Sequence, residues 1–120
     1  MLNISSEDVK VFFPKYDVPE LVKKLRTALS LISKNLRLTD ARLFGSYVTG
    51  NYTAHSDIDV LAAIDGNDKR DAYSRCWDAI RIPELKLHVY TAIEIEKMRL
   101  NGNPFLGRVM NDSIELLGRK

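Results

Sequence analysis

Cysteine is almost absent from this sequence, because Cys76 is the single thiol among 120 residues. One thiol cannot form an internal disulfide, so a disulfide-stapled secreted scaffold is excluded. The helix-like run around Cys76 favours a small core residue over a nucleophile. Long hydrophobic runs are missing too, and the N-terminus has neither the basic start nor the apolar stretch of a secretion signal. We therefore expect a cytoplasmic protein that does not enter a membrane.

A strong excess of charge of either sign is also missing. The net charge is +2, which is too small to predict nucleic-acid binding by itself. Hydrophobic residues make up 45% and charged residues 28% of the chain, the normal balance for a globular protein. The length suits one compact domain and is too short for two. We expect a single domain over residues 1–120, in which residues 1–16 form a poorly defined N-terminal extension.

The spacing of apolar residues predicts helices that alternate with strands. Helices are expected over 19–35, 68–80, 92–100 and 105–110, and strands over 41–44, 57–64 and 85–90, with a final strand or extended tail over 114–117. This order indicates an α/β (α+β) fold in which helices flank a small mixed sheet.

Two aspartates open the strand expected over 57–64. Side chains two apart on a strand point to the same face, so Asp57 and Asp59 should project together. Ionised carboxylates at such a distance repel each other, and a hard divalent cation such as Mg²⁺ relieves the repulsion. The alternative is a pair of solvent-facing strand residues, although aspartate is a poor strand former.

A glycine and a serine end the preceding strand. Gly45 allows the backbone to approach a ligand or to adopt a positive φ angle. If a helical turn starts at Ser46, its free N–H groups and its hydroxyl form an anion site suited to triphosphate oxygens. An ordinary tight turn is the alternative. Tyr47 and Tyr52 follow in the same segment, and they either fill the rim of the domain or stack on a base.

Together these residues resemble the signature of the DNA polymerase beta nucleotidyltransferase superfamily. That signature is Gly-Ser, ten intervening residues and Asp-x-Asp, and here it reads Gly45-Ser46 and Asp57-Ile58-Asp59. The flanking residues agree with the family as well: Leu43-Phe44 before the glycine, Gly50 after the serine and Ser56 before the first aspartate. The short chain is most similar to the minimal nucleotidyltransferases, which often pair with helical HEPN proteins in toxin–antitoxin modules.

The resemblance implies a polymerase beta palm-like fold and a metal-dependent enzyme. Such an enzyme transfers a nucleoside monophosphate from a nucleoside triphosphate, ATP in the toxin–antitoxin members, to an acceptor such as a HEPN protein. Asp57 and Asp59 would be catalytic and would bind Mg²⁺ or Mn²⁺, while Gly45 and Ser46 would bind the nucleotide phosphates. A nucleic-acid template is not expected, since the chain has no room for a template-binding domain. Whether the chain forms a homodimer stays open.

One feature departs from the superfamily, which usually carries a third carboxylate on a later strand. The strand expected over 85–90 has no acid in its middle. Glu84 at its edge and His88 within it are both candidate third ligands; Glu84 suits Mg²⁺, whereas imidazole suits Mn²⁺ better. Lys86 could instead neutralise one of the aspartates. The alternative function is therefore a catalytically weak or inactive module that neutralises or scaffolds a HEPN-like partner by contact.

Overall fold

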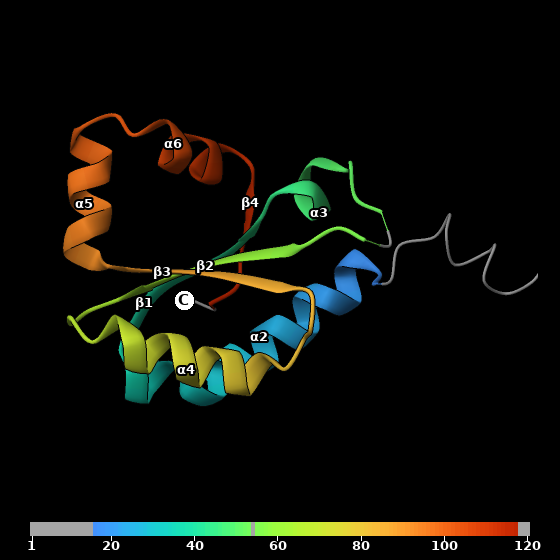
Figure 1. The fold of residues 1–120 in the computed structure, drawn as a ribbon, viewed down its shortest axis with the longest axis horizontal. Coiled ribbons are helices and arrows are strands. Elements are labelled where there is room, and N and C mark those ends of the chain that lie inside the picture. Colours follow the sequence, from blue (N-terminus) through green and yellow to red (C-terminus); the bar gives the residue numbers. More distant parts are fainter. Residues whose placement is uncertain (1–15, 54, 118–120) are drawn as a thin grey trace, which may run out of the picture.

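The computed structural model describes residues 16–53 and 55–117. The extension expected over residues 1–16 thus lies outside the described residues, apart from Tyr16. Figure 1 shows the elements, coloured along the chain. In order they are α2 (Val18–Leu36), β1 (Leu38–Phe44), α3 (Ser46–Thr49), β2 (Ile58–Ile64), α4 (Lys69–Ile80), β3 (Leu85–Thr91), α5 (Ala92–Leu100), α6 (Pro104–Asn111) and β4 (Ser113–Glu115).

The four strands form one mixed sheet in the order β3-β2-β1-β4. β1 pairs antiparallel with both β2 and β4, whereas β2 and β3 run parallel. The predicted fold class is therefore confirmed. β1 starts three residues before the expected Ala41, because Leu38 still pairs with Ile64 at the far end of β2.

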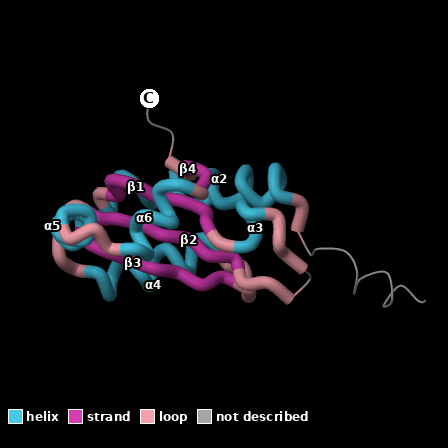
Figure 2. Tube along the Cα trace, turned by 90° about the horizontal axis from the view of Figure 1, so that it is seen from above, coloured by secondary structure: helices cyan, strands magenta, loops and turns pink. Residues whose placement is uncertain are grey.

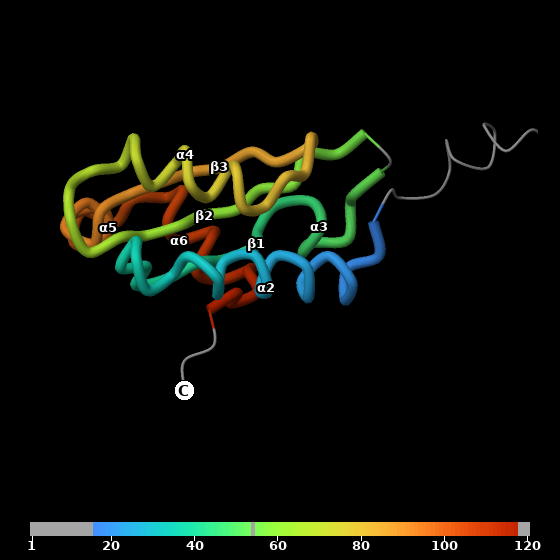
Figure 3. The backbone as a smooth tube through the Cα atoms, turned by 90° about the horizontal axis from the view of Figure 1, so that it is seen from below, coloured from blue at the N-terminus to red at the C-terminus, as the bar shows by residue number. Residues whose placement is uncertain are grey.

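Helices cover both faces of this sheet. Helices α2 and α4 lie side by side on one face (Figures 1 and 3), where they contact each other closely. Helices α5 and α6 lie on the opposite face, and α6 crosses above the middle of the sheet (Figure 2). Within the described part of the chain, no helix is long and apolar enough to cross a membrane.

The main core lies between the sheet and the layer of α2 and α4. Leu25 and Leu29 of α2 and Val60 of β2 are fully buried there, as is Cys76 of α4. Burial raises the pKa of the Cys76 thiol to about 11, so the reactive thiolate is scarce near neutral pH. The prediction that Cys76 is a small core residue is confirmed.

Local sequence signals fix where the helices begin. The Thr91 hydroxyl accepts the Glu94 N–H at 3.0 Å, and the Glu94 carboxylate accepts the Thr91 N–H at 2.9 Å. This reciprocal pair is a capping box, which satisfies two donors at the start of α5. Asp68 caps α4 in a similar way by accepting the Asp71 N–H at 3.0 Å. These caps explain why α4 and α5 begin within one residue of their predicted starts.

Burial along α2 gives a direct test of the core. We expect Leu25→Ala to lower the free energy of unfolding by about 2–5 kcal/mol, because it opens a cavity at a site with 0% exposure. Leu31→Ala is the matched control, since Leu31 lies on the same helix and is 76% exposed; its loss should stay within about 0.5 kcal/mol. Urea unfolding followed by circular dichroism measures both. Equal losses would contradict the placement of α2.

Candidate active site

Gly45 lies at the end of β1 with its backbone against the Asp59 side chain. Its φ is +84°, a conformation that L side chains rarely adopt. A Cβ atom at this position would lie 2.5 Å from Oδ2 of Asp59, closer than real Cβ atoms come. The register of the sheet causes this approach, because Phe44 pairs with Asp59. Both the backbone conformation and the lack of space therefore require glycine.

The short helix α3 follows directly and has Ser46 as its first residue. The Thr49 N–H donates to the Gly45 carbonyl at 3.1 Å, and the Gly50 N–H closes the turn on the Ser46 carbonyl at 3.0 Å. N–H groups in the first turn of a helix have no upstream carbonyl within that helix. The backbone N–H groups of Ser46 and Tyr47 are thus the groups that an anionic ligand can use.

The loop before β2 is shaped by Ser56. Its hydroxyl accepts the Thr53 N–H at 2.8 Å, and its own N–H donates to the Thr53 carbonyl at 3.2 Å. Asp57 follows, exposed to solvent. The strand begins at Ile58, one residue later than expected, where the Ile58 N–H bonds to the Glu84 carbonyl at 2.9 Å. Ser56 therefore closes the turn that leads through Asp57 into β2.

Asp59 is the second residue of β2, and its carboxylate meets His88 of β3. His88 Nε2 lies 3.5 Å from Asp59 Oδ1, at the outer limit of a hydrogen bond. The two side chains are 24% and 21% exposed, respectively, so the pair is largely enclosed but reachable. Lys86 is paired with Asp59 in the register of the sheet but is exposed. The side chain of β3 that contacts the Asp59 carboxylate is therefore His88 and not Lys86.

Two phenylalanine rings hold the imidazole of His88. Its ring centroid lies 5.2 Å from that of Phe44 and 5.8 Å from that of Phe105. The two phenylalanines meet edge to face at 5.5 Å, a favourable aromatic geometry. Sequence reasoning did not assign Phe44 or Phe105 to the site, because an apolar residue at a strand end or in a short helix usually indicates core.

Glu84, the other candidate third ligand, lies in the turn before β3 and contacts tyrosines. The Tyr16 hydroxyl donates to Glu84 Oε1 at 3.2 Å. Burial, and secondarily the charge of Glu84, raise the pKa of the Tyr47 hydroxyl. Tyr47 is 3% exposed and stacks on Tyr52 with ring centroids 4.5 Å apart. Of the two roles considered for Tyr47 and Tyr52, packing is the one that the structure favours.

The acidic side chains do not form a complete metal cage. Among the residues that the structure describes, no three side chains of His, Cys, Asp or Glu gather closely enough to hold a metal ion. Asp57 and Asp59 offer at most a partial shell. Such a shell suits Mg²⁺, which commonly takes one or two carboxylates together with waters and substrate phosphate oxygens.

A cavity of about 300 Å³ opens beside Gly45, between the end of β1 and α6. Its wall is formed by Phe44, Gly45, Thr49, Phe105, Arg108, Val109 and Asp112. The α6 residues were not predicted as site residues, since nothing in their spacing indicates that α6 folds back over the end of β1.

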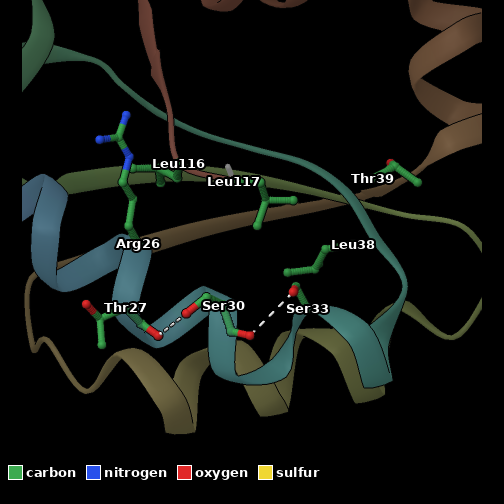
Figure 4. Close-up of a pocket in the computed structure, with 8 residues that line it drawn as sticks. All are labelled: Arg26, Thr27, Ser30, Ser33, Leu38, Thr39, Leu116 and Leu117. Atoms are coloured by element: carbon green, nitrogen blue, oxygen red, sulfur yellow. Dashed lines mark hydrogen bonds between the residues drawn. The ribbon is translucent and has the colours of Figure 1, made fainter. Parts of the chain in front are cut away.

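A larger hollow of about 520 Å³ lies on a different part of the molecule, between α2 and the ends of β1 and β4 (Figure 4). Arg26 beside it donates to the Glu115 carbonyl, from Nη2 at 2.8 Å and from Nε at 3.3 Å. The hollow shares no wall residue with the cavity at Gly45, and neither Asp57 nor Asp59 lines either of them. Arg26 thus serves to fasten β4 to α2.

The motif and its geometry have a counterpart among known families. The model of the family described as a nucleotidyltransferase domain matches residues 22–114. The chain belongs to the nucleotidyltransferase domain family. The match runs from α2 into β4 and includes every residue of the Gly45–Asp59 motif. The sequence prediction of a nucleotidyltransferase is thereby confirmed.

Solved structures resemble this nucleotidyltransferase at low sequence identity. One is a candidate nucleotidyltransferase from Sulfolobus solfataricus, with a TM-score of 0.56, 18% identity, and coverage of 82% of this chain and 80% of that one. Another is a toxin–antitoxin complex with AMP-PNP, with a TM-score of 0.47, 17% identity, and coverage of 79% and 74%. No curated protein matches the chain in sequence. The first likeness shows a shared fold.

The contact between Gly45 and Asp59 leads to a mutational test. We expect Gly45→Ala in this nucleotidyltransferase to weaken Mg²⁺–ATP binding at least tenfold, because the new methyl group displaces the Asp59 carboxylate. Isothermal titration calorimetry measures the affinity, and circular dichroism checks that the variant folds.

Gly50→Ala is the control, since Gly50 also has a positive φ, +92°, but a Cβ there would meet nothing within 4 Å. It should carry the backbone strain, about 1–3 kcal/mol of stability, and keep its affinity. If Gly45→Ala bound Mg²⁺–ATP as tightly as Gly50→Ala does, the role given to the contact would be wrong.

Proposed function

We propose that this nucleotidyltransferase transfers a nucleoside monophosphate from ATP to an acceptor in a reaction that needs Mg²⁺ or Mn²⁺. One observation carries the proposal: the backbone of Gly45 is pressed against the Asp59 carboxylate, within 2.5 Å of where a Cβ would sit. This contact supports the proposal, because it brings the turn that we propose to bind phosphate next to the carboxylate that we propose to bind the metal.

The turn supplies the donors for the triphosphate. The N–H groups of Ser46 and Tyr47 and the Ser46 hydroxyl lie at the start of α3, next to Gly45. A phosphate oxygen that accepted these bonds would lie close to Asp59, because the glycine has no side chain to separate the turn from the carboxylate. Donors fixed before the substrate arrives stabilise the charge that develops on phosphate without reorganisation.

The carboxylates supply hard oxygen ligands for a divalent ion. The chemistry of this donor set fits Mg²⁺, which commonly takes one or two carboxylates together with phosphate oxygens and waters. When bound, such an ion neutralises the carboxylates and phosphates and favours in-line attack by an acceptor hydroxyl. Asp57 and Asp59 would be its protein ligands, and their charge is what attracts it.

His88 is the better placed of the two candidate third ligands. It contacts Asp59 at 3.5 Å, whereas Glu84 accepts a hydrogen bond from Tyr16. Phe44 and Phe105 fix the imidazole in place. We therefore assign to His88 a position from which it can contact a metal held at Asp59, although Asp57, Asp59 and His88 do not form a closed group of three in the described part of the chain. Glu84 is assigned a structural role at the start of β3.

The acceptor is proposed to be a protein hydroxyl, on a HEPN-type helical partner such as those that pair with minimal nucleotidyltransferases. The resemblance of the motif to that of the minimal nucleotidyltransferases supports this choice. The second candidate function is a module that neutralises or scaffolds such a partner by contact alone. It is favoured by the lack of a third carboxylate beside Asp59 among the described residues.

Nucleotide binding is the first test. Titration of ATP in the presence of Mg²⁺ should show binding that the double variant Asp57→Asn/Asp59→Asn abolishes. Asp65→Asn/Asp78→Asn is the control, since it removes two charges at exposed positions outside the motif and should keep the affinity. Unchanged binding in the motif variant would remove the site from this location.

Two single variants distinguish His88 from Glu84 as the third metal ligand. We expect His88→Ala to weaken binding of the metal–ATP complex, more with Mn²⁺ than with Mg²⁺, because imidazole suits Mn²⁺ better. Glu84→Gln should leave the affinity within about twofold with either metal. The opposite pattern in calorimetry would assign the ligand to Glu84.

Catalysis is tested by transfer of label. Incubation with ATP labelled at the α-phosphate, Mg²⁺ and a candidate HEPN partner should label the partner and release pyrophosphate. If the wild type binds ATP but labels no acceptor with either metal, while still binding the partner, the contact module becomes the better description.

A further inference from the structure

We propose that the cavity beside Gly45 is a nucleobase subsite that selects an amino-bearing base over uracil, with Phe105 and Asp112 as the residues that read the base. This inference rests on the proposed function, since it concerns the same triphosphate. It adds what the motif does not contain: the residues that recognise the part of the nucleotide beyond the phosphates.

The position of the cavity is the first argument. Gly45 and Thr49 of the phosphate-binding turn form one side of it, and α6 forms the other. A nucleotide whose phosphates bind at Ser46 therefore has its remaining atoms within reach of this hollow. The volume of about 300 Å³ is at the lower end of ligand pockets, which matches a base rather than a large acceptor.

The apolar part of the wall suits a flat aromatic ligand. Phe44 and Phe105 both line the cavity, and their mutual edge-to-face contact at 5.5 Å holds them in place. Val109, 2% exposed, forms the floor from the buried side of α6. Stacking on an aromatic side chain is a general way to bind bases, because every base has a π face.

The polar part of the wall supplies selectivity. Arg108 and Asp112 both line the cavity from the end of α6, where the Asp112 N–H bonds to the Arg108 carbonyl at 3.0 Å. An ionised carboxylate only accepts hydrogen bonds. Asp112 therefore favours a base that presents an exocyclic amino group, and it repels the carbonyl oxygens of uracil. The Arg108 guanidinium can donate to ring nitrogens of the same base.

The cavity also lies near Asp59, which agrees with this arrangement. Phe44 connects the two regions, because its ring contacts His88 on one side and the cavity on the other. His88 in turn contacts Asp59. The base and the metal-binding carboxylate would thus flank Gly45, which places the phosphates between them.

The test compares three probes, each with Mg²⁺: ATP, UTP and inorganic tripolyphosphate, which has no base. Wild type should bind ATP more tightly than UTP, and both more tightly than tripolyphosphate. Phe105→Leu, which retains apolar volume, should weaken the affinity for ATP about tenfold. It should leave the affinity for tripolyphosphate within about twofold of wild type. Asp112→Asn should reduce the preference for ATP over UTP, because the amide can donate to a uracil carbonyl. Asp78→Asn, outside the cavity, should change none of these affinities.

The outcomes separate the subsite from the phosphate site. Wild type that binds tripolyphosphate as tightly as ATP and UTP would overturn the subsite and leave the proposed phosphate site standing. The subsite would also be overturned if Phe105→Leu lost affinity for ATP and for tripolyphosphate equally. An unchanged ratio of ATP to UTP affinity in Asp112→Asn would overturn it as well. If wild type binds none of the three probes, the proposed function fails and the subsite with it.

Discussion

The close approach of Gly45 to Asp59 is the constraint around which the site is arranged. It exists because β1 and β2 are antiparallel in a register that pairs Phe44 with Asp59. The residue after Phe44 then has no room for a Cβ, and it turns the chain at φ +84° into α3. A shift of the register by one residue would turn Asp59 to the opposite face of the sheet, where the core is packed. The pairing of the two strands thus fixes the distance between the first turn of α3 and the Asp59 carboxylate.

The two faces of the sheet have different roles, one in stability and the other in the candidate site. One face is packed by α2 and α4 into an apolar core, and this packing holds β1 and β2 in register. On the other face Phe44 contacts His88, which in turn contacts Asp59, and α6 lies over this face of the sheet (Figure 2). Since stability comes mainly from the first face, the second can keep a cavity and the contact between Asp59 and His88.

Most secondary structure could be predicted from the sequence because local signals specify it. The capping box of Thr91 and Glu94 and the apolar stripe of α2 each indicate an element by short-range chemistry. Errors occurred where long-range pairing decides the boundary. β1 extends back to Leu38 because Ile64 offers a partner, and β2 begins at Ile58, which leaves Asp57 outside the strand.

For the site, the sequence by itself determined the family and its motif residues, because the spacing from Gly45 to Asp59 is set along the chain and can be counted. It also determined that Cys76 is a core residue, since its surroundings are helical and apolar. Only the tertiary structure decided which candidate lies beside Asp59, because His88 reaches it through the pairing of β2 with β3. Only the tertiary structure brought Phe105 and Asp112 to Gly45 as well, because the fold of α6 over the sheet joins residues about sixty positions apart. Such contacts arise from packing between layers, and no local pattern encodes them.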